Sequence, residues 1–538
     1  MNEITQKRWG MTIDVNRCVG CQTCTVACKH ANDTVPGVQW RKVLDVEVGR
    51  YPDVERLFLV TGCQHCAEPS CVPVCPTGAT KQREDGLVTM DYDLCIGCAS
   101  CAVACPYQAR TIVHDKPTYF GVSTAQEIKV AHDERVGVAQ KCTFCIDRVD
   151  DGLAEGLIPG IDPLATPACA SSCISQAIKF GDFNDPKSHV SQLAKNRDFF
   201  QMHEELGNDP QIKYLIETPA VPARISDDKD LDDEALSDIE NSLVGERQTF
   251  WDLRAAMNFI LGGIGSGAIV MAYVVNLLTP VGNTDFLRIN LISSGVIAMG
   301  LFFVWLKIGR KLRAPLAILR PQTSWMSREI YAVGLLFLSI GLGIFYPSPI
   351  LEAIAAASAA AFLYCQGRIL HSGKGIPTWR VSQMPLMLIA TGLLEGIGLF
   401  SLLNFTWGTQ VTANSPILPL AILLILFNSF LWRRYLRNLK VWGIGPIDRN
   451  ILNRITPKLY IIGYLLPLTL YGIIFLDLSS LSLLAQISGF LVIMGGVLWK
   501  AILITQACHM QNFALGKLPQ RGSGKFAAPI NIEKDLSK

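Results

Sequence analysis

The sequence predicts an α+β domain followed by an all-α bundle of membrane-spanning helices. Its 538 residues exceed the usual length of one domain, so at least two domains are expected. Two observations place the division near residue 250. Sixteen of the 18 cysteines lie between Cys18 and Cys173 in a polar segment, whereas long apolar runs separated by short basic loops follow residue 250. The net charge of +2 gives no reason to expect nucleic acid as a partner.

The cysteines of the polar segment fall into four groups with regular spacing. Three thiolates two residues apart can wrap an iron–sulfur cube from one tight loop, and the cysteine that follows is placed to ligate the neighbouring cube of a pair. At four cysteines per cube, the groups predict four [4Fe–4S] clusters. The groups are Cys18-x2-Cys21-x2-Cys24-x3-Cys28; Cys63-x2-Cys66-x4-Cys71-x3-Cys75; Cys95-x2-Cys98-x2-Cys101-x3-Cys105; and the split group Cys142-x2-Cys145 with Cys169-x3-Cys173.

Zinc is the alternative metal, because it is often held by pairs of cysteines two residues apart. A zinc site does not need the third and fourth cysteines of each run, nor the proline that follows Cys75 and Cys105. The first residues contain neither an apolar secretory signal nor twin arginines, so a disulfide framework is not expected. The spacing therefore favours iron–sulfur clusters over zinc.

We expect the four groups to cooperate in nested pairs, as two interleaved ferredoxin-like units do. Residues 1–185 are therefore predicted to form a double ferredoxin-like iron–sulfur domain of the α+β class. His65, between two cysteines, is expected to pack or to hydrogen-bond beside a sulfur and not to bind iron. The predicted ligand sets are Cys18, Cys21 and Cys24 with Cys173; Cys142, Cys145 and Cys169 with Cys28; Cys63, Cys66 and Cys71 with Cys105; and Cys95, Cys98 and Cys101 with Cys75.

The region from Met11 to Phe183, which carries these groups, resembles the four-cluster iron–sulfur subunit of the dimethyl sulfoxide reductase family of molybdenum enzymes. The resemblance implies a row of clusters between a molybdopterin catalytic subunit and the membrane. It also implies that the Cys18 cluster lies nearest molybdenum and the Cys95 cluster nearest the membrane. Some relatives replace the third cysteine of the third group with tryptophan and hold a three-iron cluster. This sequence keeps Cys101, so four irons are expected there.

The remaining chain is predicted to contain a linker, a membrane anchor and a tail. Residues 186–250 carry no cysteine and are predicted to be an acidic linker, with its charge concentrated between Asp227 and Glu234. Residues 511–538 are predicted to be a cytoplasmic tail. Residues 251–510 contain eight apolar stretches close to the ~20 residues needed to cross a bilayer, at about 256–279, 289–308, 329–347, 350–367, 383–404, 415–432, 458–477 and 481–504.

The basic residues of the loops predict the orientation of the anchor. Alternate loops contain 22 Lys and Arg residues in all, and the intervening loops contain only Arg288. Positive charge is retained on the cytoplasmic side of membranes. We therefore expect both termini and the iron–sulfur domain on the cytoplasmic side of the inner membrane.

The segment from Lys307 to Glu329 resembles the loop between the second and third spans of the anchor subunit in the same family. In that family a His-Leu-Gly-type motif and a downstream Arg-Glu pair border the quinone pocket. This chain has Lys307 where the histidine would be, whereas Glu329 matches. The resemblance implies that both residues bind quinone or quinol and that Glu329 exchanges a proton with it. The alternative for Glu329 is an interfacial charge that pairs with Arg328 or with a neighbouring helix.

Together these features predict an electron-transfer and membrane-anchor subunit that links the quinone pool to a molybdopterin catalytic subunit in anaerobic respiration. The substrate site is expected on that other subunit, which either oxidises a sulfite-type donor or reduces an S- or N-oxide. An alternative is a redox-driven proton-translocating module in which Glu395 and Glu329 are steps of a proton path. For Glu395, a structural hydrogen bond to a facing helix is the favoured interpretation. An enzyme that acts alone is not expected, because no pterin- or nucleotide-binding motif is present.

Overall fold

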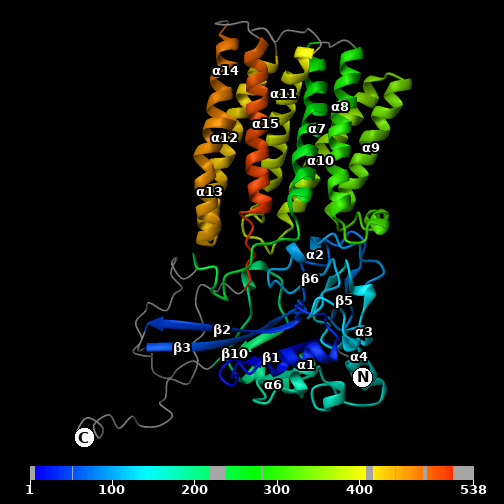
Figure 1. Cartoon of the computed structure of the whole chain (residues 1–538), viewed down its shortest axis with the longest axis vertical. Helices are drawn as coiled ribbons and strands as arrows, with labels where there is room; N and C mark the ends of the chain where they lie inside the picture. Colours follow the sequence, from blue (N-terminus) through cyan, green and yellow to red (C-terminus); the bar gives the residue numbers. More distant parts are fainter. Residues whose placement is uncertain are drawn as a thin grey trace, which may run out of the picture.

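The computed structural model describes residues 6–50, 53–216, 237–279, 283–406, 416–442, 444–476 and 482–512. Figure 1 shows a domain of strands and short helices at one end of the molecule and a bundle of long helices at the other. The predicted division into an α+β domain and an all-α bundle is confirmed.

A four-stranded sheet forms the base of the α+β domain. Its strand order is β8 (Ile178–Asp182), β1 (Trp9–Asp14), β10 (Ile212–Leu215) and β9 (Phe199–Phe200). Met11 of β1 pairs with Phe180 of the antiparallel β8 and with Ile212 of the parallel β10. All six residues of β1 are buried, so both faces of this strand are covered by other parts of the domain.

The α+β domain extends beyond residue 185, the end that the sequence predicts. Residues 186–216 contain α6 (His189–Asn196), β9 and β10, and β10 completes the sheet beside β1. The buried side chains of Ile212 and Tyr214 pack into the same core as β1. The predicted linker is therefore too long at its N-terminal end. Its acidic stretch, Asp227 to Glu234, lies outside the described residues.

Two hairpins, a third antiparallel strand pair and several short helices complete this domain, and most of the helices contain or directly follow cysteines. The hairpins are β2 (Arg41–Arg50) with β3 (Asp53–Gly62) and β4 (Thr80–Gln82) with β5 (Val88–Met90), and the third pair is β6 (Thr111–Ile112) with the antiparallel β7 (Ala139–Gln140). The helices are α1 (Thr23–Ala31), α2 (Ser100–Val103), α3 (Ala125–Lys129), α4 (Ile146–Ala154) and α5 (Ala168–Ser171).

Within the described residues, eight helices are long and apolar enough to cross a membrane. The seventh is continuous from α13 through a π-helical turn at Tyr460–Leu465 into α14, and therefore begins earlier than the predicted span at 458. The helices are α7 (Leu253–Leu278), α8 (Asn283–Lys307), α9 (Trp325–Phe345), α10 (Pro349–His371), α11 (Met384–Thr406), α12 (Ile417–Trp442), α13 (Pro446–Leu459) with α14 (Leu466–Phe475), and α15 (Ser482–Thr505).

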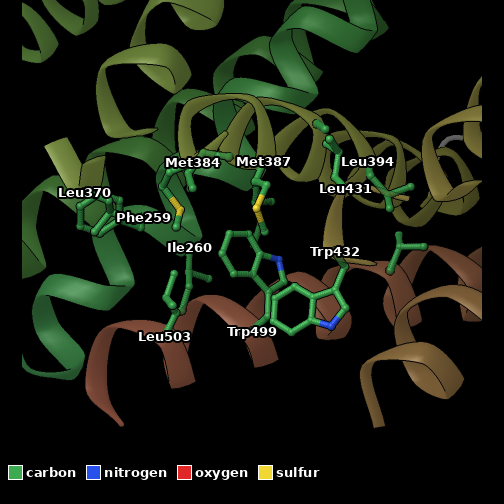
Figure 2. Close-up of a cluster of buried hydrophobic side chains, with 14 of the residues drawn as sticks. Phe259, Ile260, Leu370, Met384, Met387, Leu394, Leu431, Trp432, Trp499 and Leu503 are labelled. Atoms are coloured by element: carbon green, nitrogen blue, oxygen red, sulfur yellow. The ribbon is translucent and has the colours of Figure 1, made fainter. Parts of the chain in front are cut away.

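Helices α7 and α11 are the most buried of the bundle, and their backbones approach each other closely at glycines. A Cβ atom added at Gly267 of α7 would collide with the carbonyl group of Gly392 in α11, so the close approach needs glycine there. The core continues toward α12 and α15. Figure 2 shows Met387 of α11 beside the indole rings of Trp499 and Trp432, whose centroids are 6.2 Å apart.

Candidate functional site

The structure brings the cysteine groups together in four sets, each with members from two groups. The membership of each set matches one predicted ligand set, except that Cys21 is exposed and its thiol contacts Thr23 at 3.3 Å. The neighbouring thiols are Cys24 with Cys18 and Cys173; Cys28 with Cys142, Cys145 and Cys169; Cys66 with Cys63, Cys71 and Cys105; and Cys75 with Cys95, Cys98 and Cys101.

The donor sets fit iron–sulfur clusters in their chemistry, because every member is a free thiol. Among the described residues, no three His, Cys, Asp or Glu side chains converge closely enough to hold one metal ion. A cubic cluster would take one cysteine thiolate on each of its irons, and thiols are the donors that each set offers. Burial raises the pKa of the Cys98 thiol to about 11 and that of Cys101 to about 12. Bound iron would supply the positive charge that keeps such buried sulfurs deprotonated.

Two buried arginines, which no local sequence motif marks, lie among these thiols. Arg41 is fully buried, and its pKa is lowered by burial but raised overall by the thiols of Cys169 and Cys142 and their neighbours. Its thiol neighbours come from the two outer sets, which are formed by the first and fourth cysteine groups and contain Cys24 and Cys28. The guanidinium of Arg41 therefore places a fixed positive charge between two sets of sulfurs.

Arg110 has the equivalent position between the two inner sets, which are formed by the second and third cysteine groups. It is 3% exposed, and its Nη2 atom donates to the Sγ atom of Cys71 at 3.1 Å. Its charge interacts with thiols of both inner sets, among them Cys63 and Cys101. A positive charge at this position favours the more negative, reduced state of any cluster bound there.

His65 uses both ring nitrogens in hydrogen bonds to the backbone. Its Nδ1 atom accepts from the Val88 amide at 3.1 Å, so its Nε2–H group donates to the Cys142 carbonyl, also at 3.1 Å. Burial lowers the pKa of His65, which keeps the ring neutral. The ring stacks on Phe144 with centroids 3.8 Å apart. His65 is therefore held beside the cysteines by hydrogen bonds and packing.

The third cysteine group lies directly against the helix bundle. The amide of Arg310, beyond α8, donates to the Ile96 carbonyl, and the amide of Gly375, beyond α10, donates to the Val103 carbonyl, both at 3.0 Å. The indole Nε1 of Trp251 donates to the Cys98 carbonyl, also at 3.0 Å. In Figure 1, α2 lies next to the bundle, whereas α1, which carries Cys24 and Cys28, lies on the far side of the domain.

A cavity of about 180 Å³ lies where this cysteine group meets the bundle, and it contains both residues proposed for quinone. Cys98 lines it from the α+β domain, Lys307 from the end of α8 and Glu329 from the first turns of α9. Trp305 and Phe259 provide apolar walls. A small polar cluster thus faces an otherwise apolar space, as in many ligand sites.

The polar groups of this cavity are only partly satisfied. The Asn258 side chain donates to Glu329 Oε1 at 3.3 Å. The Lys307 Nζ atom is buried and has no hydrogen-bond partner within the described residues. Arg328, the alternative partner for Glu329, instead donates to the carbonyls of Pro321 and Gln322. A bound polar molecule would satisfy the ammonium group of Lys307.

Glu395 lies deep in the bundle and forms an ion pair with Lys500 of α15, with 2.6 Å between Oε2 and Nζ. The predicted hydrogen bond to a facing helix is confirmed. Lys500 is among the 22 basic residues assigned to loops, but the structure places it inside α15 at 1% exposure, so it is not part of the orientation signal. A Cβ atom at Gly263 or Gly496 would collide with the pair, so the glycines make room for it.

Comparisons with known proteins agree with the cysteine pattern. Residues 54–119 match the family model described as a 4Fe-4S dicluster domain. A subunit of the selenate reductase of Mesobacillus selenatarsenatis is 38% identical over 231 residues, which are 40% of this chain and 73% of that protein. The putative iron-sulfur subunit of a dimethyl sulfoxide reductase from Halobacterium salinarum is 37% identical over 254 residues, or 45% of this chain and 90% of that protein.

A third relative is named for a quinone. The iron-sulfur cluster-binding subunit of menaquinone reductase from Nitratidesulfovibrio vulgaris is 37% identical over 226 residues, which are 39% of this chain and 88% of that protein. Each of these three alignments covers less than half of the chain. Their lengths are comparable to that of the segment that precedes α7.

Proposed function

This chain belongs to the iron–sulfur electron-transfer subunits of the dimethyl sulfoxide reductase family and contains helices that fit a multi-pass membrane anchor, and we propose that it links membrane quinone to a molybdopterin catalytic subunit. The observation that carries the proposal is the cavity shared by Cys98, Lys307 and Glu329. It combines a candidate cluster ligand with polar groups at the membrane end of the cysteine array.

The four cysteine sets are proposed to hold four [4Fe–4S] clusters. Bound clusters supply one-electron carriers. The chain supplies the thiolates that hold them and the buried cations Arg41 and Arg110 that offset their negative charge. The array runs from α1, on the far side of the domain, to α2 beside the bundle, which supports one end for a catalytic partner and the other for quinone (Figure 1).

Lys307 and Glu329 are proposed to bind the head of the quinone. Oxidation of a quinol releases protons as well as electrons, so the site needs a proton acceptor beside the electron acceptor. The Glu329 carboxylate is the proton acceptor, and Asn258 fixes its Oε1 atom at 3.3 Å. The Lys307 ammonium donates a hydrogen bond to a quinone oxygen. In quinone reduction the same groups act in the opposite direction.

The names of the relatives support the proposed catalytic partner, and the distribution of basic residues supports the proposed sidedness. Relatives are named as subunits of selenate reductase, sulfite dehydrogenase and tetrathionate reductase, which supports a separate catalytic subunit here. The substrate site, for a sulfite-type donor or an S- or N-oxide, belongs to that subunit. The basic ends of α10 and α12 lie on the same side as the iron–sulfur domain, which supports a cytoplasmic location for this domain.

The test uses the full chain, purified in detergent and reconstituted in membrane nanodiscs. We expect about sixteen irons per chain from four cubic clusters, and bleaching of the cluster absorbance when menaquinol is added. Glu329→Gln should slow that bleaching about 100-fold, because a positioned acid–base group contributes that much to proton transfer. Glu352→Gln is the matched control, since Glu352 lines a cavity at the opposite end of the same helices. Zinc in place of iron, or equal rates in both variants, would contradict the proposal.

A redox-driven proton-translocating module is the second candidate, favoured by one observation. The ion pair of Glu395 and Lys500 is buried in the bundle, and Lys500 also donates to the carbonyl of Phe259, which lines the quinone cavity. Proton uptake by sealed vesicles during quinol oxidation measures this activity. Net transfer across the membrane that is lost in Glu395→Gln would support a pump. Uptake or release confined to one side would support a plain anchor.

A further inference from the structure

A second cavity, of about 630 Å³, lies between the iron–sulfur domain and the ends of α9 and α10. One wall is the segment Glu68–Val74, which includes residues between cysteines of the second group. The other wall contains Trp325, the first residue of α9, together with Arg368, His371 and Lys374 at the end of α10. The cavity is therefore at the level where the bundle leaves the membrane.

The cavity contains two cations that lack a carboxylate partner. Within the described chain, neither Arg368 nor Lys374 forms an ion pair, and the buried Nε atom of Arg368 has no hydrogen-bond partner. The Nζ atom of Lys374 donates to the carbonyl of Leu206 at 3.1 Å, which fixes its position at the wall. Glu68 is the one carboxylate among the described lining residues. A buried N–H group without an acceptor is costly, so the site favours an anion that accepts hydrogen bonds.

The surroundings of the cavity are those of a membrane–water interface. The Trp325 ring is contacted by two guanidinium groups, that of Arg328 at 4.1 Å and that of Arg368 at 4.8 Å from its centroid. Tryptophan with neighbouring arginines is typical of the headgroup level of a bilayer. Tyr364 packs edge-on against the same ring, with 5.4 Å between centroids.

An exposed apolar strip continues from the cavity along α10 into the membrane region. Ala357, Ala361, Tyr364 and Arg368 follow each other at intervals of three or four residues, and the first three are exposed. Residues with this spacing share one face of a helix. The two alanines leave the strip shallow, which gives room for an acyl chain below the cations. A free inorganic anion would not need such a strip.

We propose that this cavity binds the phosphate headgroup of an anionic phospholipid through Arg368 and Lys374, with an acyl chain along the exposed strip of α10. The bound lipid contacts both the iron–sulfur domain and the bundle, so it strengthens the junction that holds the third cysteine group beside the quinone cavity. The inference depends on the bundle spanning a membrane and is independent of what the quinone cavity binds.

The experiment measures lipid retained by the full chain. The protein is delipidated in detergent, incubated with phosphatidylglycerol or phosphatidylcholine, and examined by native mass spectrometry. We expect retention of phosphatidylglycerol and not of phosphatidylcholine. Arg368→Gln and Lys374→Gln should each weaken this binding about fivefold, the contribution of one basic residue near an anionic headgroup. Arg434→Gln, an exposed arginine on α12, is the matched control and should bind as the unaltered chain does.

Further arms separate the possible results. Arg368→Lys keeps the charge and should retain most of the binding, and an unchanged iron content shows that each variant is folded. Inorganic phosphate at millimolar concentration should fail to displace the lipid. Displacement by phosphate alone would identify a free-anion site and overturn the lipid assignment. Equal retention of the two lipids, or equal loss in the Arg434 control, would also overturn it.

Discussion

Replacing Arg110 with methionine should lower the reduction potentials of two of the four proposed clusters. The guanidinium is buried and donates to the Cys71 sulfur at 3.1 Å, and its charge reaches thiols of both inner sets. The added electron of a reduced cluster is spread over the cube, and at roughly 6 Å from this charge and an effective dielectric constant of about 20 the interaction contributes about 3 kcal/mol. For a one-electron couple this corresponds to about 120 mV.

The measurement is a redox titration followed by electron spin resonance, which resolves the individual couples. Two couples should move downward by about 100 mV in Arg110→Met, as the loss of one nearby charge requires. Arg110→Lys keeps the positive charge and should move them much less. Arg41→Met should move the other two couples, so each variant is the control for the other. Iron content is measured first, because the titration needs intact clusters.

Two results would refute this reasoning. A shift of all four couples together would mean that the effect is a general loosening of the domain. An absence of any shift would mean that solvent or other charges already screen the guanidinium. Either result would remove the buried arginines as determinants of the potentials.

The remaining predictions concern packing and metal. Glu395→Gln should destabilise the chain by about 3–5 kcal/mol in thermal unfolding in detergent, because it leaves the buried Lys500 charge unpaired. Adding Lys500→Met to this variant should recover most of the lost stability. No recovery in the double variant would contradict this account. Gly97→Ala should cost the third cysteine group its cluster, measured as iron content, because Gly97 has a φ of +71° and an added Cβ would collide with the carbonyl of Gly137. Gly121→Ala, at a φ of +78° but in open space, should keep its iron. Removal of iron by a chelator should expose residues 6–216 to proteolysis while α7–α15 stay protected, because the buried thiols and arginines then lose their counter-charges.

The sequence alone determined the features whose signals are local. Three thiolates two residues apart belong to one loop, so the spacing from Cys18 to Cys28 identified the metal chemistry without any tertiary information. The apolar stretches likewise predicted all eight long helices found among the described residues, because a span must satisfy its backbone within its own segment. Resemblance to a known anchor also singled out Lys307 and Glu329, which the structure places in one cavity.

Tertiary structure decided the features that depend on residues far apart in the chain. Arg41 and Arg110 are ordinary arginines in sequence, and only the fold buries them between sulfur sets. In sequence, the residues of β10 belong to the predicted acidic linker. Only the pairing of β10 with β1, at the other end of the domain, shows that they form a strand of the sheet. In sequence, Lys500 belongs to a predicted loop, and only the packing of the helices shows that it forms a buried ion pair with Glu395. Pairing between residues far apart in the chain leaves no periodic signal in the sequence. Which strand or charged side chain becomes the partner is decided by how the helices and strands pack.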